Sequence, residues 1–554
     1  LIVRSEYGRN ALQGEADKTG HHWFETDASG NILDRNGNVV QDLNTHREVT
    51  GVNVQETEWH DKLFPSTQPL YDHLDQVYDA GQYMTQYAAV EGRTGNTNFR
   101  ASFTYQDDKG VMPDWNDGAR LKGFRLNVDH QVRESLDIGL STYYSRSDQE
   151  DLGGSPFYAL AFQNPFVDLL RRDTATIGLP HCPDQGCLVN VPDPFNLEEN
   201  PLYSLEMLDR FDERSRFMGN AIMNWSPANW FRMEGNFSLD RSDYFQSNMT
   251  PRGYETEQSV SVGNVNKSQN ISNDISASIT THFTKTFGEL TSRTQLRYLM
   301  EDRHSESFNA SGSETLAYGV PVLDNAATYT AGSSVSDVRA EGYYFITYLD
   351  YRGKYVGDIL VRRDGSSLFG PDERWQTYYR AAGAWRLSQE EWWPFENVNE
   401  FKLRYSIGTA GGRPSFANQY ETYSVNQNGI FPRNLGNKKL KPELTTEQEA
   451  GLEMVFFNNI SAGAVYSWRT TEDPLPRQPL LSPAGFSTQW INGGTVESNT
   501  YEAWLETAFI DTPDMTWTSR NNWDRTRQEI TKLGLTLYPS GYQYISEGEA
   551  VGTF

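Results

Sequence analysis

The sequence has few cysteines, a shortage of basic residues and no long hydrophobic run. Its 554 residues include 2 cysteines, and 48 lysines and arginines stand against 74 aspartates and glutamates, for a formal net charge of −26. Nucleic-acid binding needs clustered basic side chains, so nucleic acid is excluded as the main partner. The apolar stretches all fall short of the roughly 18 residues that a transmembrane helix requires.

Motifs of common hydrolases are also absent. The sequence has no G-x-S-x-G and no H-E-x-x-H, and its 9 histidines are scattered. Its many acidic residues single out no pair of carboxylates suited to glycoside hydrolysis. We therefore expect no enzyme, no catalytic residue, no cofactor and no metal. A secreted all-β enzyme acting on glycans stays open as an alternative. A surface adhesin is another, although no repeat of fixed period is present.

The two cysteines, Cys182 and Cys187, lie in the segment HCPDQGC. A disulfide between them would close a short loop and would suit an oxidising compartment. The neighbouring His181 raises a metal site, but one histidine and two cysteines lack a fourth ligand and match no common zinc spacing. We expect the disulfide, with free thiols and a metal site as alternatives.

Aromatic residues are abundant, with 14 Trp, 30 Tyr and 28 Phe, although the mean hydropathy is only −0.66. Disordered chains are poor in aromatics, so we expect an ordered structure that buries little core. Apolar and polar residues alternate in segments about ten residues long, for example 98–107, 124–132, 230–241 and 500–510. That length fits strands that cross a bilayer at a tilt better than the strands of soluble proteins.

Short turns alternate with long polar stretches along the chain. Turns are predicted at 133–135, 226–229 and 352–353, and one short helix at 69–81. Long loops are predicted at 148–210, 246–270, 305–335 and 410–440. This layout is typical of outer-membrane barrels, in which one face of each strand meets lipid and the other a polar lumen.

Aromatic residues near the ends of the predicted strands suggest girdles at the two membrane interfaces, although ordinary β-propensity also explains any single one. The girdle candidates are Tyr143, Tyr144, Trp225, Trp230, Tyr343, Tyr344, Tyr378, Tyr379, Trp468 and Trp523.

The segment VRRDGSSLFGPDERW, residues 361–375, resembles a signature of SusC/RagA-type TonB-dependent transporters. Other segments resemble the same family in the same order, although the family's Asn is missing from the first. They are TEWHDKLF (57–64), NFRASFTYQDDKGVMP (98–113), RLKGFRLNVDH (120–130), GAWRLSQEEW (383–392), FKLRYSIGTAGGRP (401–414) and LKPELTTEQEAGLEM (440–454). The resemblance covers residues 57–554.

The resemblance implies an all-β fold, a transmembrane antiparallel β-barrel of the 22-stranded type. It implies an integral protein of the bacterial outer membrane, in contact with its lipid, that imports oligosaccharides or peptides without bond chemistry. The implied partners are a SusD-like lipoprotein lid and the TonB-ExbB-ExbD complex, which acts through an N-terminal segment. We expect residues 1–56 to hold the start of the barrel or the plug-to-barrel region and 57–554 the barrel strands with long extracellular loops. The plug, the TonB box and the final strands are expected to lie outside this sequence, so that only part of the barrel is present.

Two groups of residues are candidates for function. Trp115, Trp392, Trp393 and Trp490 are predicted to lie on long loops, where they could stack on a substrate. Within the family signature, we expect the root of a loop to be fixed by Arg362, Arg363, Asp364, Gly365 and Arg374. Gly365 is expected to permit the turn, with Ser366 and Ser367 bonded to local backbone.

Overall fold

A computed structural model gives the fold of most of the chain. It describes residues 1–12, 27–29, 38–39, 70–150, 156–165, 167–179, 182, 184–190, 199–255, 259–370, 373–412, 415–426, 429–481, 483, 485–534, 538–540 and 543–550. The family-like segment at 57–64 and His181 lie outside the described residues, so the predictions made for them are not addressed.

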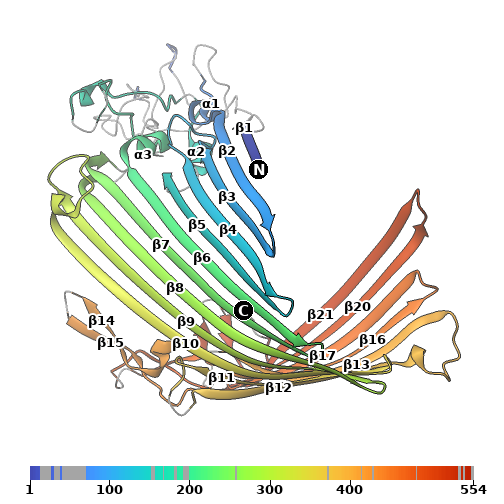
Figure 1. Cartoon of the computed structure of the whole chain (residues 1–554). Helices are drawn as coiled ribbons and strands as arrows, with labels where there is room; N and C mark the ends of the chain where they lie inside the picture. Colours follow the sequence, from blue (N-terminus) through green and yellow to red (C-terminus); the bar gives the residue numbers. More distant parts are fainter. Residues whose placement is uncertain are drawn as a thin grey trace.

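The chain forms one large, curved antiparallel sheet of 17 strands that is open along one side (Figure 1). Each strand of this sheet pairs with the strand of the sheet that follows it in sequence. Among the described strands, β1 and β21 form the two edges. The all-β prediction is confirmed. The strands are β1 (Ile2–Asn10), β2 (Gly81–Thr94), β3 (Thr97–Asp108), β4 (Ala119–Arg133), β5 (Leu136–Glu150), β6 (Asp209–Ala228), β7 (Phe231–Glu255), β8 (Val260–Phe287), β9 (Leu290–Thr315), β10 (Ala326–Tyr351), β11 (Tyr355–Ser366), β12 (Trp375–Arg386), β13 (Val398–Gly411), β16 (Leu444–Phe456), β17 (Ile460–Glu472), β20 (Thr495–Asp511) and β21 (Thr516–Lys532).

Smaller elements occupy the connections. A four-stranded sheet contains β14 (Thr422–Asn426), β15 (Gly429–Leu435), β18 (Arg477–Pro479) and β19 (Thr488–Trp490), and a two-stranded one contains β22 (Tyr538–Ser540) and β23 (Gln543–Ile545). The helices are α1 (His73–Val77), α2 (Phe157–Phe162) and α3 (Pro201–Met207), with 3₁₀ turns η2 (Thr174–Thr176), η3 (Leu323–Asn325), η4 (Leu387–Gln389) and η5 (Phe416–Gln419). None of the described helices is long and apolar enough to cross a membrane.

The helix predicted at 69–81 is real but shorter. Asp72 caps the N-terminus of α1, because its Oδ1 accepts a hydrogen bond from the backbone N–H of Leu74 at 3.1 Å. The helix ends at Val77, and the backbone of Tyr78 is already extended. The apolar spacing at both ends of the predicted range therefore belongs to coil.

The connections differ in length between the two ends of the sheet. At one end, tight turns join β4 to β5 at 134–135 and β10 to β11 at 352–354, which confirms both predicted turns. Gly353 there has a φ of 66°, a conformation that glycine adopts without strain. The turn predicted at 226–229 lies further along, at 229–230, because β6 continues to Ala228. We call this the turn end, and the opposite end, with the longer connections, the loop end.

Strands β7–β10 are much longer than the predicted ten residues, with 25, 28, 26 and 26 residues. The loops predicted at 246–270 and 305–335 are therefore wrong, since most of those residues lie in the strands. Beyond the bilayer both faces of a strand meet water, so the apolar alternation stops while the backbone ladder continues. A polar sequence without alternation hides such an extension.

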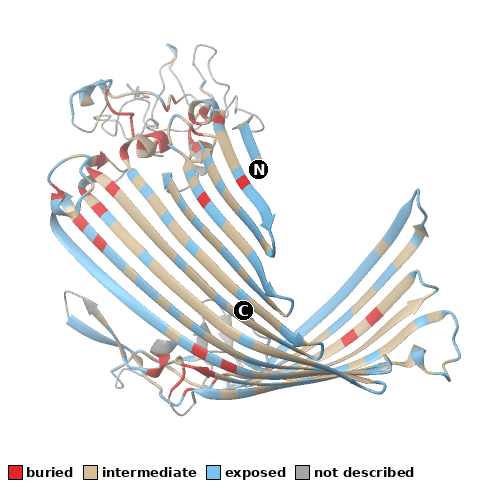
Figure 2. Ribbon diagram, viewed as in Figure 1, coloured by how far each residue is buried: buried red, intermediate tan, exposed pale blue. Residues whose placement is uncertain are grey.

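The main hydrophobic core lies in the connections at the loop end, not between layers of the sheet (Figure 2). Val77, Leu169, Leu188 and Leu202 are at most 2% exposed and pack together there. We call this cluster the loop core. Segments from several connections meet in it, so the long loops form a packed cap.

A disulfide and two tyrosines complete the loop core. Cys187, which is buried, is joined to Cys182 with their Cα atoms 4.6 Å apart. The rings of Tyr203 and Tyr254 stack at 5.2 Å. Burial raises the pKa of Tyr254 to about 12 and also raises that of Tyr203.

Candidate functional site

The large sheet has two chemically different faces. Phe103, Phe124 and Tyr144 lie opposite one another on neighbouring strands, and each is 46–48% exposed. The residues next to them in sequence point to the opposite face of the sheet, and some of these, such as Arg125, are charged. In a transmembrane barrel the apolar face must meet lipid, so the charged face is the inner wall.

Aromatic rings mark the two borders of the lipid-facing band on β12. At one border, the ring centres of Trp375 and Tyr343 are 6.0 Å apart. At the other, ten residues further along β12, the ring of Trp385 stacks on that of Tyr355 with their centres 6.0 Å apart. Ten residues span about 33 Å along a strand, or roughly 25 Å across a bilayer at the usual tilt. This height matches the apolar band of outer-membrane barrels.

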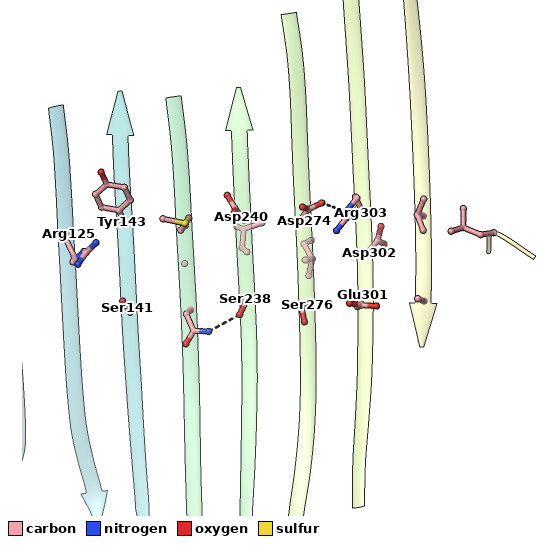
Figure 3. Close-up of a pocket in the computed structure, with 18 residues that line it drawn as sticks. Arg125, Ser141, Tyr143, Ser238, Asp240, Asp274, Ser276, Glu301, Asp302 and Arg303 are labelled. Atoms are coloured by element: carbon pink, nitrogen blue, oxygen red, sulfur yellow. Dashed lines mark hydrogen bonds and ion pairs between the residues drawn. The ribbon is translucent and has the colours of Figure 1, made fainter. Parts of the chain in front are cut away.

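The inner wall contains a hollow of about 680 Å³ that spans β4–β10 (Figure 3). Arg303 Nε donates to Asp274 Oδ1 at 3.1 Å within it. Asn220 Nδ2 donates to Ser238 Oγ at 2.8 Å, and the guanidinium of Arg125 lies 5.2 Å from the centre of the Tyr143 ring. The hollow thus presents charged and neutral polar groups side by side, which suits binding of a polar ligand by hydrogen bonds.

A second hollow of about 440 Å³ lies further round the inner wall, over β10–β13 and β16. Arg380 Nε donates to Asp358 Oδ2 at 2.9 Å at its edge, and Arg404 is paired with Glu449. Ion pairs between neighbouring strands let charged side chains line a lumen, because each charge has a partner close by. Among the described residues, no group of His, Cys, Asp and Glu is arranged to hold a metal ion.

The residues predicted at the loop root lie on both faces of β11. Arg362 and Asp364 form an ion pair on the inner wall, with the Arg362 guanidinium 5.2 Å from the Tyr344 ring. Arg363 points to the other face, over Trp375 at 5.8 Å. The structure thus separates the two arginines, because neighbouring strand residues face opposite ways.

Gly365 lies in β11 and not in the turn, so its predicted role is wrong. A Cβ at this position would come within 2.9 Å of the Trp375 ring, so the glycine makes room for that ring. The loop root is held instead by backbone bonds: Ser367 N donates to Arg339 O at 2.9 Å, and Ser366 N to Arg374 O at 3.2 Å.

The four predicted tryptophans do not come together. Trp115 packs against the loop core, and Trp490 ends β19, where its carbonyl accepts from Asn437 Nδ2 at 3.0 Å. Trp392 and Trp393 lie at the turn end, between β12 and β13, so their predicted place on a long loop is wrong. The ring of Trp392 is 6.4 Å from that of Trp385, in the aromatic border described above.

The girdle prediction holds for only part of its set. Tyr144, Tyr343 and Tyr379 share the lipid-facing side, while the residues adjacent to them in sequence face inward. Tyr143 and Tyr344 line the two hollows instead. The alternation within β5 could have placed Tyr143 on the inner wall, because Leu136, Ile138 and Leu140 share the side of Tyr144. Tyr344 could not be placed in this way, since apolar residues occupy both faces of β10 around it.

Comparison with known proteins adds independent information. No family model matches the chain. TonB-dependent receptor P26 of Formosa agariphila is 22% identical over 524 residues, covering 88% of this chain and 51% of the relative. TonB-dependent receptor SusC of Bacteroides thetaiotaomicron is 23% identical over 511 residues, covering 83% and 48%. The chain spans about half the length of these curated relatives.

Solved structures agree with this result. The RagAB peptide importer in its 'closed-closed' state superposes with a TM-score of 0.70 at 18% identity, over 99% of this chain and 63% of the importer chain. The chain is SusC/RagA-like. Its fold is the antiparallel barrel sheet of TonB-dependent receptors, which are integral to the outer membrane.

A second structure, that of the RagAB peptide transporter, superposes with a TM-score of 0.69 at 19% identity. The superposition covers 87% of this SusC/RagA-like chain and 55% of the transporter chain. These relatives are named receptors and transporters. The resemblance to SusC/RagA-type transporters that was predicted from the sequence is confirmed by these relatives.

Proposed function

We propose that this chain serves TonB-dependent import of oligosaccharides or peptides across the bacterial outer membrane, by binding and gated passage. The observation that carries the proposal is the division of the sheet into a lipid-facing side and an inner wall of ion pairs and polar hollows. A receptor barrel needs both surfaces at once. SusC is named a TonB-dependent receptor and RagAB a peptide importer, which supports this reading.

The partners follow from the same relatives. We propose a SusD-like lipoprotein as a lid at the loop end, and TonB-ExbB-ExbD as the source of energy. The packed loop core supports the first part, because it gives the loop end a shaped surface on which a lid can rest. We also propose that residues 1–56 form the start of the barrel or the plug-to-barrel region, and that residues 57–554 form the barrel strands and their loops.

The substrate contacts are proposed at the loop end. Trp115 and Trp490 lie there and could stack on a ligand that enters the inner wall. Trp392 and Trp393 lie at the other end, so we propose that they anchor the barrel in the interface.

Uptake in the source bacterium tests the function. Cells are fed a mixture of isotope-labelled oligosaccharides and peptides, with TonB intact or deleted, and with the gene for this protein intact or deleted. We expect one class of label to enter only when both are intact. Equal entry in all four strains would contradict the proposal.

Purification in mild detergent from native outer membranes tests the lid. We expect a lipoprotein to co-purify with this chain in near-equal amount, as measured by mass spectrometry. Recovery of the chain alone, or in the secreted fraction, would contradict the proposed assembly.

A further inference from the structure

The inner wall changes character above the first hollow. Below, the paired residues Asp240, Asp274 and Arg303 are charged, whereas the next five rungs across β7–β10 contain no charged side chain. These rungs are Ser242, Ser272, Ser305 and Ser336; Tyr244, Asn270, Ser307 and Ser334; Gln246, Ser268, Asn309 and Gly332; Asn248, Asn266, Ser311 and Thr330; and Thr250, Asn264, Ser313 and Thr328. We call them the hydroxyl–amide wall.

The wall lies outside the bilayer. Each of the four strands needs about 9–11 residues from the turn end to cross the membrane. On β7, which starts at Phe231, the crossing is complete near residue 241, and the wall begins at Ser242. The wall therefore faces the entrance of the lumen, where an incoming substrate arrives first.

The wall contains its own hollow, of about 480 Å³, lined mostly by hydroxyl and amide side chains of the wall and also by Lys267, Ala310 and Ala331. The side chains of Gln246, Ser268, Asn309 and Thr330 make no hydrogen bond with any described residue. Oδ1 of Asn248 is buried and has no partner among the described residues. A buried polar atom without a partner, such as Asn248 Oδ1, is uncommon. The other four side chains are half-buried or exposed, so they are open to a ligand.

Except for Tyr244, whose hydroxyl donates to the carboxylate of Asp212 on β6 at 2.8 Å, the side-chain bonds of the wall join neutral groups among the described residues. Ser307 Oγ lies 2.8 Å from Ser334 Oγ, and Ser313 Oγ lies 2.7 Å from Thr328 Oγ1. Hydroxyl and amide groups both donate and accept, as sugar hydroxyls do. Four strands and five rungs give a surface of about 14 by 27 Å, long enough for several linked sugar units.

We propose that the hydroxyl–amide wall binds a neutral oligosaccharide before it passes to the charged hollow below. The inference rests on the proposed import function and narrows its substrate. The wall itself has no charged partner for the charged termini and side chains of a typical mixed peptide. Charged groups begin at its edge, on β6, where Arg210, Asp212 and Arg214 lie opposite Asn248, Gln246 and Tyr244. A neutral glycan can exchange its hydrogen bonds with water for bonds with the hydroxyls and amides of the wall.

The test uses the protein purified in detergent from its own outer membrane. It is immobilised and exposed to a mixture of neutral oligosaccharides from starch, β-glucan, xylan and mannan, and separately to a tryptic digest of casein. Retained molecules are identified by mass spectrometry, and the Kd of the tightest is measured by calorimetry. We expect oligosaccharides to be retained in preference to peptides.

Three substitutions, Gln246→Ala, Asn248→Ala and Asn309→Ala, remove amides from the hollow. Each is expected to raise the Kd about five-fold, and all three together at least about thirty-fold. The matched control is Ser247→Ala, Asn273→Ala and Ser333→Ala, on the opposite face of the same strands, with a Kd within about two-fold of wild type. Heat-modifiable migration on a gel verifies that both triple variants are folded.

Three results would overturn the inference: retention of no oligosaccharide, preferential retention of peptides, or an unchanged Kd in the first triple variant. If the first triple variant still takes up substrate in a TonB-dependent manner, the wall is not part of the transport path. The proposed import function is not contradicted by that result. Loss of TonB dependence in the wild type would remove the proposed function itself.

Discussion

Tyr203 ties the loop core to the large sheet through one hydrogen bond. Its hydroxyl oxygen accepts from the backbone N–H of Glu255, the last residue of β7, at 3.0 Å. Replacement of Tyr203 by Phe removes this half-buried hydrogen bond, which costs about 1 kcal/mol. We expect the variant's loops to be cut faster in limited proteolysis, with the strands unaffected. Tyr329→Phe, at a residue that is 72% exposed, is the control and should behave as wild type.

Tyr254, whose ring stacks on that of Tyr203, should make the stability of the loop core depend on pH. Burial raises the pKa of Tyr254 to about 12, above the usual tyrosine pKa of about 10. The folded loop core thus favours the neutral phenol, so its contribution to stability is complete below pH 10 and is lost as the pH rises through about 12. A difference titration at 295 nm between wild type and Tyr254→Phe measures this group alone. A midpoint near pH 10 would show that the ring is not buried.

Asp364 is the acidic residue of the predicted loop root. It pairs with Arg362 on the inner wall, and its own side chain is only 12% exposed. Replacement by Ala leaves a half-buried guanidinium without its partner, so we expect less folded barrel in the outer membrane. Affinity for substrate per folded molecule should change little. Asp514→Ala, in the turn after β20, is a control for loss of an acidic residue. Normal assembly with weakened binding would make Asp364 a substrate ligand instead.

At the scale of elements, the extended strands make a prediction about accessibility. Ser333 lies on the part of β10 that rises beyond β11, whereas Ala381 lies mid-way along the lipid-facing side of β12. A membrane-impermeant maleimide added to intact cells should label Ser333→Cys and not Ala381→Cys. The two native cysteines give little background because they are joined in a disulfide. Labelling of both positions, or of neither, would contradict the assigned membrane band.

The membrane-crossing strands could be predicted from sequence because lipid forces an alternation that is visible in the residues. Phe99, Phe103 and Phe124 show it clearly. The extracellular parts of β7–β10 could not, since water on both faces removes the alternation and leaves a polar stretch that reads as a loop. The small helix α1 was overestimated because its cap and end, not its apolar spacing, set its length.

The inner-wall hollows could not be predicted, for a different reason. Arg125, Asn220 and Arg303 meet in one hollow only because five inter-strand registers bring their strands into line. A one-residue change in any register would send one of them to the lipid face. Arg362 and Asp364, predicted together from the family-like segment, form an ion pair, whereas the predicted role of Gly365 is wrong.

For the whole molecule, the division into two faces explains how a chain with a mean hydropathy of −0.66 can reside in a membrane. Only one residue in two along a strand meets lipid, and only over the height of the apolar band. The rest of each strand, and all of the inner wall, behaves as protein in water. The loop core provides the conventional buried interior that the single-layered sheet lacks.

Adjacent residues on β11 test this division directly. Ile359 is 45% exposed on the lipid-facing side, four residues from both Tyr355 and Arg363, whereas Leu360 faces the inner wall beside the second hollow. Ile359→Arg places a charge near the middle of the bilayer and should lower the free energy of unfolding by about 2–4 kcal/mol. Leu360→Arg places the same charge in the polar lumen and should cost clearly less. Urea unfolding of both variants in lipid vesicles measures the difference, and equal losses would mean that the two faces have been assigned wrongly.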